Sequence, residues 1–233
     1  MGVGQGQEGT PLDVHRAIPG DPVADLAFEE ELIRRAAAGR PGLFLYSWRD
    51  PVLVLGVGQK PESVDLDACR REGVPVLKRS TGGTGVLSRG DLAVSLALPA
   101  SHPWAATIPG LYARFLEPLE AALRSLGVDV ARPADPPPRR QRSPLCFEDV
   151  RDETFLLDGR KCVGCAQARR RGAALVHASI LLDLKADLTA RCFGMPGDRV
   201  RAALAALPLA PDALADAVAD AMADAFVNRT RAG

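Results

Sequence analysis

The chain has 233 residues and 47% of them are hydrophobic, which is enough to bury one large core or two small ones. Its 29 basic residues are balanced by 29 acidic residues, so no overall charge attracts nucleic acid or an anionic membrane. No apolar run reaches the roughly 18 residues that span a bilayer, and the Gly- and Gln-rich start has no secretion signal. We therefore expect one cytoplasmic domain over residues 1–233, with neither a nucleic-acid nor a membrane partner.

The first half of the chain predicts strands and helices after a leader at 1–10 that we expect to be mobile. In chain order these are a strand at 11–18, a helix at 21–38, strands at 43–48 and 52–57 around a turn, a short helix at 64–72, and strands at 74–77 and 92–98. Asp21 is a typical N-cap residue, and Pro22 suits the first helical position, where a missing N–H costs nothing. Gly39 and Gly73 are expected to end the two helices.

The second half predicts a long helix, a connector and a strand-rich region. In chain order these are a helix at 108–126, an exposed Pro- and Arg-rich connector at 131–143, strands at 153–157, 161–169 and 174–184, and an Ala-rich helix at 211–227. Leu111, Phe115 and Leu119 recur every four residues, so the first helix is amphipathic. Asp158 and Gly159 are typical of a tight hairpin turn. Because strands outnumber helices and hairpins join several of them, we predict an α+β fold with a mixed, largely antiparallel sheet flanked by helices.

A polar loop rich in glycine follows the strand at 74–77. Its residues are Arg79, Ser80, Thr81, Gly82, Gly83, Thr84, Gly85 and Val86. The glycines allow the backbone to approach a ligand closely, and the arginine can bind phosphate or carboxylate through two hydrogen bonds. The segment lacks the Gly-Lys-Ser/Thr ending of a P-loop. A long hairpin loop with positive φ values is the alternative interpretation.

Lys161 begins a small, apolar stretch two residues after the hairpin turn, where desolvation can make a lysine reactive. An exposed hairpin lysine is the alternative. Cys162 and Cys165 form a C-x-x-C pair, but no second pair or Cys/His cluster completes a zinc site, and we expect no metal. Their odd separation on a predicted strand should direct them to opposite faces, so we interpret both as packing residues.

Cys146 differs from the other four cysteines because it lies in a loop that follows the basic connector. A loop position near cationic groups exposes the sulfur and favours the thiolate, whereas burial in a strand does the opposite. An inert loop cysteine is the alternative. All five cysteines are expected to remain thiols in a reducing cytoplasm. His177 lies in an apolar stretch, where a structural role and a ligand contact fit its position equally well.

Taken in order, these segments resemble the superfamily of lipoate–protein ligases, octanoyltransferases and biotin ligases. The resemblance covers about residues 14–184. In the first half of the chain it consists of the opening helix with Ala27-Phe28-Glu29-Glu30, the paired strands of 43–58, the loop 79–86, and Gly90-Asp91-Leu92 with Ser95. In the second half it consists of the motif Gly159-Arg160-Lys161 with Gly164 and Ala166-Gln167, and of the strand that contains His177 and 179–182. The resemblance implies the biotin/lipoate ligase catalytic-domain fold, a mixed sheet flanked by helices.

The resemblance also implies roles for the site residues. Lys161 would contact the acyl carbonyl and, in ligases, the phosphate of an acyl-adenylate. The substrate-binding residues implied in this way, including the loop that lines the slot for the acyl chain, are Arg79, Ser80, Thr81, Gly82, Gly83, Thr84, Gly85, Val86, Gly164, Cys165, Ala166, His177 and Ser179.

In two transferase branches of the superfamily, the acyl group passes through a cysteine that precedes the family's lysine by about fifteen residues. Here Cys146 precedes Lys161 by fifteen residues. The resemblance therefore implies a monomeric octanoyl or lipoyl transferase in which Cys146 is the nucleophile and Lys161 polarises the carbonyl. The donor would be acyl carrier protein or an octanoylated H protein. The acceptor would be a lysine of a lipoyl domain, and no cofactor would be needed.

Two alternatives remain open. An ATP-dependent lipoate–protein ligase would form lipoyl-AMP and would use ATP and Mg²⁺. A protein that binds lipoyl domains without catalysis would leave Cys146 and Lys161 as structural residues.

Overall fold

The computed structural model describes residues 11–134 and 143–230. The leader predicted at 1–10 and the greater part of the predicted connector, residues 135–142, lie outside the described residues. Within the described ranges, no helix is both long enough and apolar enough to cross a membrane.

The centre of the fold is a six-stranded sheet. Its strands, in spatial order, are β1 (Asp13–Ala17), β2 (Gly42–Tyr46), β6 (Leu92–Pro99), β9 (Ala173–Ile180), β8 (Arg160–Arg170) and β7 (Phe155–Leu157). β1 and β2 are parallel, and every other neighbouring pair is antiparallel. The mixed, largely antiparallel sheet predicted from the sequence is therefore confirmed.

A second, three-stranded sheet lies beside the first. Its order is β4 (Val76–Lys78), β3 (Val52–Leu55) and β5 (Val86–Ser88), with β3 and β4 parallel. The sequence analysis expected the strands around the turn 49–51 to pair with each other, and this was wrong, because β2 and β3 belong to different sheets. Both strands are fully buried, so their hydrophobic pattern carries no information about which neighbour each one pairs with.

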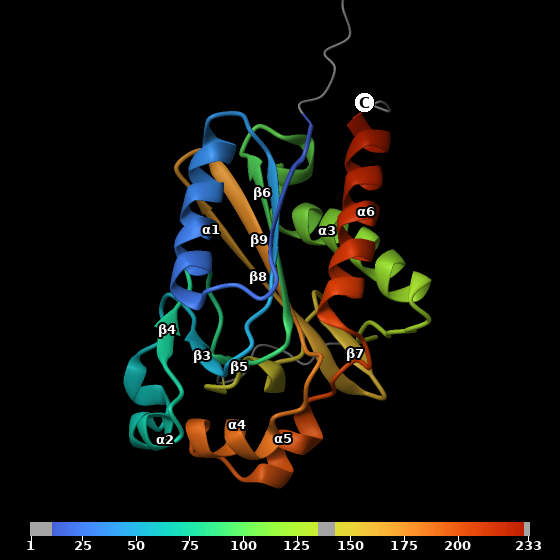
Figure 1. Cartoon of the computed structure of the whole chain (residues 1–233). Coiled ribbons are helices and arrows are strands. Elements are labelled where there is room, and N and C mark those ends of the chain that lie inside the picture. Colours follow the sequence, from blue (N-terminus) through green and yellow to red (C-terminus); the bar gives the residue numbers. More distant parts are fainter. Residues whose placement is uncertain (1–10, 135–142, 231–233) are drawn as a thin grey trace, which may run out of the picture.

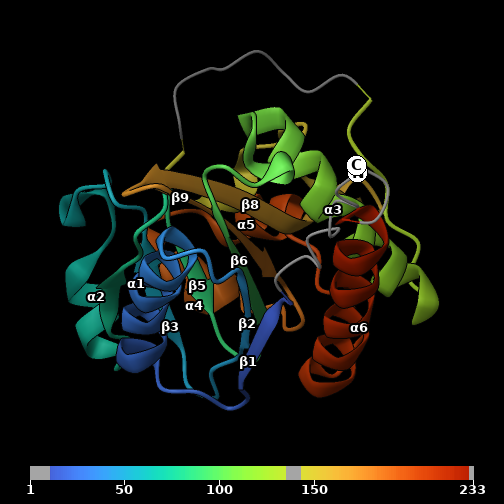
Figure 2. The same cartoon turned by 90° about the horizontal axis from the view of Figure 1, so that it is seen from above.

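The helices cover both faces of the large sheet. They are α1 (Pro22–Ala37), α2 (Leu66–Arg71), α3 (Ile108–Ser125), α4 (Ala186–Phe193), α5 (Gly197–Ala203) and α6 (Pro211–Thr230). In Figure 1, α1 lies on one side of the sheet and α3 with α6 on the other, while α4 and α5 lie at the lower end. Figure 2, seen from above, shows the same separation of α1 from α6.

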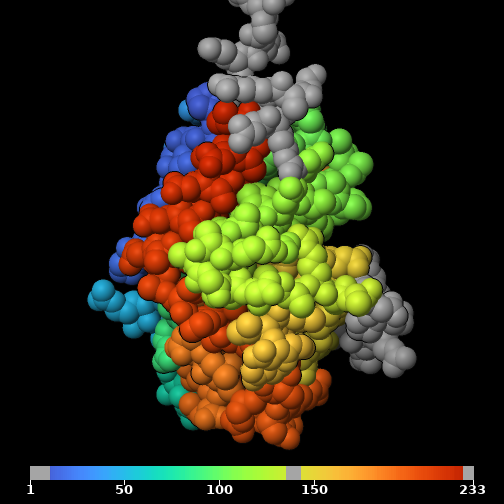
Figure 3. Space-filling view, turned by 90° about the vertical axis from the view of Figure 1, so that its right-hand side faces the viewer, coloured from blue at the N-terminus to red at the C-terminus, as the bar shows by residue number. Residues whose placement is uncertain are grey.

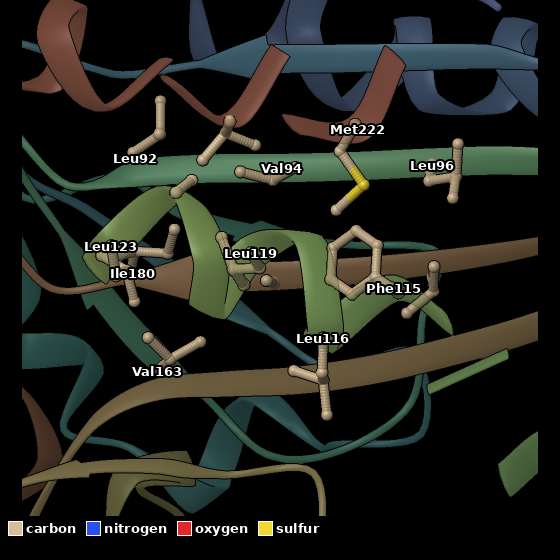
Figure 4. Packing of buried hydrophobic residues seen from close by; sticks show 14 of the residues in the cluster. Leu92, Val94, Leu96, Phe115, Leu116, Leu119, Leu123, Val163, Ile180 and Met222 are labelled. Carbon is tan, nitrogen blue, oxygen red and sulfur yellow. The ribbon is translucent and has the colours of Figure 1, made fainter. Parts of the chain in front are cut away.

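Two cores lie on the two faces of this sheet, because successive side chains of a strand point to opposite sides. Leu92, Val94 and Leu96 of β6 pack against Phe115 of α3 and Met222 of α6 (Figure 4). The space-filling view in Figure 3 shows α3 and α6 spread over that face. The opposite core joins the other face of the sheet to α1, the small sheet and α4. The site described below lies where β8, the small sheet and the segment after 143 meet.

Local signals in the sequence placed the ends of several elements correctly. The Asp21 side chain accepts a hydrogen bond of 2.8 Å from the backbone N–H of Ala24, as an N-cap residue does. Gly39 ends α1 at φ +82°, and Asp158 and Gly159 form the β7–β8 turn at φ +51° and +76°. Two positive φ values in a two-residue loop are the geometry of the predicted hairpin.

Candidate active site

Cys146 is held at the edge of the glycine-rich loop by backbone hydrogen bonds. It begins a short 3₁₀ helix, Cys146–Glu148, and its N–H donates to the carbonyl of Gly85 at 2.8 Å. The N–H of Gly85 donates in turn to the carbonyl of Pro144, also at 2.8 Å. The nucleophile candidate and the loop are therefore joined as one unit although about 60 residues separate them.

Lys161 reaches Cys146 because of an irregularity in β8. The β7–β8 register runs from Phe155 opposite Val163 to Leu156 opposite Lys161, so Cys162 is an extra residue on the β8 side. Such a bulge changes the face to which the preceding side chain points. Lys161 consequently shares a face with Gly164, whose Cβ position would lie 2.9 Å from the Lys161 Cε.

The amine of Lys161 is almost completely enclosed, with 3% of the residue exposed. Its Nζ donates to the backbone carbonyls of Asp149 at 2.7 Å and of Cys146 at 3.1 Å. The Cys146 Sγ lies 4.0 Å from this Nζ. Two of the three ammonium protons thus have fixed acceptors, and the amine is held next to the sulfur.

Burial distinguishes the other cysteines from Cys146. Burial raises the pKa of Cys162 and of Cys192 to about 12, and it raises the pKa of Cys69 and Cys165 as well. These four thiols therefore stay protonated at neutral pH and are poor nucleophiles. All five cysteines are free thiols in the structure, in agreement with the sequence prediction.

The prediction that Cys162 and Cys165 point to opposite faces was wrong. Both side chains pack against the core that lies between the sheet and α3. The cause is the bulge at Cys162, which shifts the alternation of side chains by one residue. Among the residues in the described ranges, no group of three or more His, Cys, Asp or Glu side chains is arranged to hold a metal ion.

Two cavities meet at Cys146. The larger measures about 440 Å³ and lies between the glycine loop, the N-terminal half of α3 and the segment 149–154. The smaller measures about 20 Å³ and is lined by Gly164, His177 and Ser179 on the sheet and by Val86 on the loop. Cys146, Cys165 and Ala166 line both cavities, so the sulfur lies where the larger and the smaller cavity meet.

The predicted loop residues divide between these spaces. Gly82, Gly83 and Thr84 line the larger cavity, and Val86 and Arg79 line the smaller one. Thr81 is buried and is not among the residues that line either cavity. Ser80 lies apart, because it lines a different cavity next to α1.

Arg79 supports the loop from within. Its guanidinium is 5% exposed and donates to the carbonyls of Gly82 at 2.7 Å and Thr84 at 3.0 Å, and to the hydroxyl of Thr81 at 3.0 Å. A fourth, longer bond reaches the carbonyl of Val54 at 3.4 Å. Four of the roughly five N–H donors of an arginine are thus used within the protein. Contact with an anionic ligand, as the sequence analysis expected, would require some of these bonds to break.

His177 belongs to a buried polar network that the sequence analysis did not identify. The His177 Nδ1 lies 2.8 Å from the Glu29 Oε1, and the hydroxyls of Ser95 and Tyr46 donate to the same oxygen at 2.5 and 3.0 Å. Burial alone would raise the pKa of Glu29, but the ion pair and hydrogen bonds with these three residues outweigh burial and lower it. Glu29 is fully buried and lies on the inner face of α1 with Asp25, Leu32, Ile33 and Ala36. A carboxylate among the apolar residues of a helix face is the sequence signal that could have indicated this network.

Changing Gly164 to valine is expected to reduce activity by about 100-fold, since displacement of a reacting group by about 1 Å costs that much. A Cβ at this position would lie 2.9 Å from the Cε and 3.2 Å from the Nζ of Lys161, and 3.7 Å from the Cys146 Sγ. Steady-state assays of acyl transfer measure the effect. Gly58→Val is the matched control, because a Cβ there meets nothing within 4 Å. Wild-type rates in Gly164→Val would contradict the proposed contact between Lys161 and Cys146.

Comparison with known proteins relates this site to a family. Residues 21–226 match the Lipoyl protein ligase A/B catalytic domain. Octanoyltransferase LipM of Geobacillus kaustophilus is 34% identical over 192 residues, which cover 77% of this chain and 68% of that protein. Octanoyltransferase LipM of Staphylococcus aureus is 32% identical over 177 residues, which cover 72% of this chain and 64% of that protein. The chain thus spans about two thirds of the length of these relatives.

Solved structures show the same fold. Lipoate-protein ligase A bound with ATP superposes with a TM-score of 0.75 at 24% identity, covering 93% of this chain and 85% of that one. The bi-partite lipoate protein ligase of Thermoplasma acidophilum gives the same TM-score at 23% identity, covering 93% of this chain and 84% of that one. At these identities the likeness concerns the fold alone. The match across 21–226 is decisive, and the chain belongs to the lipoyl protein ligase A/B catalytic domain family.

Proposed function

We propose that the chain is an octanoyltransferase of protein lipoylation that carries the acyl group as a thioester on Cys146. The observation that supports this proposal best is the placement of the Cys146 Sγ 4.0 Å from the Lys161 Nζ at the junction of the two cavities. The similarity to the LipM octanoyltransferases supports the same activity. Cys69, Cys162 and Cys192 are buried, and desolvation raises the pKa of the half-buried Cys165. Cys146, beside the amine of Lys161, is therefore the favoured nucleophile.

In the first half-reaction, the Cys146 thiolate attacks the carbonyl carbon of an octanoyl thioester. The bond from this carbon to Cys146 forms, the bond to the carrier sulfur breaks, and the carrier leaves as a thiolate that takes a proton from water. Negative charge develops on the carbonyl oxygen in the transition state, and the Lys161 ammonium would stabilise it. The smaller cavity would widen to receive the acyl chain, because about 20 Å³ is room for about one water molecule.

In the second half-reaction, the uncharged amine of an acceptor lysine attacks the same carbonyl carbon. An amide bond forms, the Cys146 thiolate leaves, and the proton lost by the amine passes to solvent. We propose that the larger cavity, of about 440 Å³, admits the acyl-bearing arm of the carrier first and the acceptor lysine second. The carrier arm and the acceptor lysine would then both approach the Cys146 sulfur through the same cavity.

The proposed partners follow from this chemistry. The donor is acyl carrier protein or an octanoylated H protein, and the acceptor is a lipoyl domain. A thioester is already activated, so the transfer needs no ATP, whereas the ligase alternative starts from a free acid and requires ATP and Mg²⁺. We further propose that the enzyme acts as a cytoplasmic monomer.

The test is to mix the protein with octanoyl-carrier protein, without ATP, and to weigh the intact chain. The expected result is the mass of one added octanoyl group, located on the peptide that contains Cys146, and its loss when a lipoyl domain is added. Transfer of free lipoate that strictly requires ATP, with no adduct from the thioester, would favour the ligase instead. Absence of transfer under all these conditions would favour a binding protein without catalysis.

A further inference from the structure

The smaller cavity, of about 20 Å³, is lined by Cys146 at one end and by His177 at the other, with Gly164 and Ala166 of β8 between them. In the β8–β9 register, Gly164 is opposite Ser179 and Ala166 is opposite His177. A Cβ on Gly164 would lie 3.7 Å from the Cys146 Sγ, so this end of the cavity is next to the sulfur. Two residues of a strand span about 7 Å, so His177 lies about that far from Gly164 along the strand direction.

The floor between these two ends is made of small residues. Gly164 and Ala166 lie on the same face of β8, because their side-chain positions are two residues apart. Glycine and alanine leave the space in front of the sheet free at these two positions, whereas the imidazole of His177 occupies it. The cavity is thus bounded by small residues along β8 and by a large side chain at His177.

The far end is also the most firmly held part of the cavity. The His177 Nδ1 is 2.8 Å from the Glu29 Oε1 and 3.0 Å from the Ser95 Oγ, and 8% of the residue is exposed. Glu29 is 0% exposed and receives a further hydrogen bond from the Tyr46 hydroxyl at 3.0 Å. Moving the imidazole aside would take a hydrogen-bond partner away from a fully buried carboxylate, which is unfavourable.

We propose that Glu29 positions His177 as the end wall of the acyl slot, and that this wall sets the longest acyl chain that Cys146 accepts. The inference rests on the proposed function. An extended eight-carbon chain is roughly as long as two to three residues of a strand, which matches the distance from Gly164 to His177. Glu29 is a positioning residue in this arrangement, and His177 is the group that touches the end of the chain.

The wall provides selectivity because it cannot yield at low cost. One methylene group in an apolar pocket is worth roughly 10- to 200-fold in discrimination. A ten-carbon chain would have to displace an imidazole that is hydrogen-bonded to Glu29 and Ser95 rather than an apolar side chain. The slot should therefore bind shorter chains with a gradual loss of contact and reject longer chains sharply.

The test measures the initial rate at which Cys146 is acylated by carrier-protein thioesters of six, eight, ten and twelve carbons. The wild type should prefer eight carbons. His177→Ala removes the wall and should raise the ratio of ten-carbon to eight-carbon acylation at least about ten-fold. Glu29→Gln keeps the shape of the side chain but removes its charge, and it should raise the same ratio by a smaller factor.

Two substitutions on one face of β8 complete the test. Ala166→Val narrows the floor beside His177 and should shift the preference to six carbons, which also covers the case that His177→Ala does not fold. Ala168→Val is the matched control, because Ala168 lies one step beyond His177 on the same face, opposite Leu175, and should keep the wild-type profile. An unchanged length profile in both His177→Ala and Ala166→Val would overturn the proposal.

Failure of the proposed function would be recognised separately. If the wild type is acylated by none of the thioesters, the transferase assignment fails, and the wall is then tested by binding alone. Thermal melting with free fatty acids of six to twelve carbons reads the same length preference without any transfer. A steeper loss of stabilisation beyond eight carbons in the wild type than in His177→Ala is the expected result, and identical profiles would reject the wall.

Discussion

Replacing Cys146 with serine is expected to abolish octanoyl transfer, with kcat/KM lower by roughly 10⁴- to 10⁶-fold. The hydroxyl of serine is a far weaker nucleophile than a thiolate, and the Lys161 ammonium beside it cannot make it ionise at neutral pH. Replacement with alanine removes the attacking atom altogether. Intact-mass measurement should show no octanoyl adduct on Cys146→Ala under conditions that fully acylate the wild type.

The control for this experiment is Cys69→Ala. Cys69 is buried in the core that joins the large sheet to α1, the small sheet and α4, burial raises its pKa, and it lines none of the cavities described above. This variant should keep the adduct and the transfer rate of the wild type. Loss of a catalytic nucleophile lowers the rate by several orders of magnitude. If Cys146→Ala instead kept about a tenth or more of the wild-type transfer rate, Cys146 would not be the nucleophile.

Features that depend on neighbouring residues could be predicted from the sequence. The N-cap at Asp21, the end of α1 at Gly39 and the hairpin turn at Asp158 and Gly159 are each decided within a few residues, and each was correct. The small helices α4 and α5 were missed. They are short, and the chain between them turns at Gly194, so neither gives the long periodic pattern by which helices are recognised.

Features that depend on distant contacts could not be predicted from the pattern alone. Lys161 reaches Cys146 only because Cys162 is an extra residue opposite β7, and no local signal in the sequence marks that bulge. The partner of Glu29 is 148 residues away, so a buried carboxylate could be recognised on α1 but its link to His177 could not. The fifteen-residue separation of Cys146 and Lys161 predicted that the two residues act together only because the related family has the same separation.

Arg79 shows why residue type alone is an incomplete guide to function. An arginine next to glycines is typical of an anion site, but here the guanidinium donates to the carbonyls of Gly82 and Thr84 in its own loop. The structure therefore gives Arg79 a clear part in shaping the loop, while its contact with substrate stays a prediction.

Changing Lys161 to methionine is expected to lower the rate of acylation of Cys146 by about 10²- to 10³-fold. Methionine keeps much of the length and apolar volume of lysine but has no charge near the sulfur. Removing one preorganised donor to a developing oxyanion costs about 10²- to 10³-fold in kcat. The Lys161 ammonium would stabilise that oxyanion, so the effect should appear in kcat more than in KM.

Rapid-mixing measurement of a single acylation with octanoyl-carrier protein tests this expectation, since it separates the first half-reaction from transfer to the lipoyl domain. Lys161→Arg is the informative companion variant, because it keeps the charge but brings a planar, larger group into a space bounded by Gly164 and two backbone carbonyls. It should recover part of the rate lost in Lys161→Met. Equal rates in the wild type and Lys161→Met, with melting temperatures that show both to be folded, would mean that the charge beside Cys146 has no part in acyl transfer.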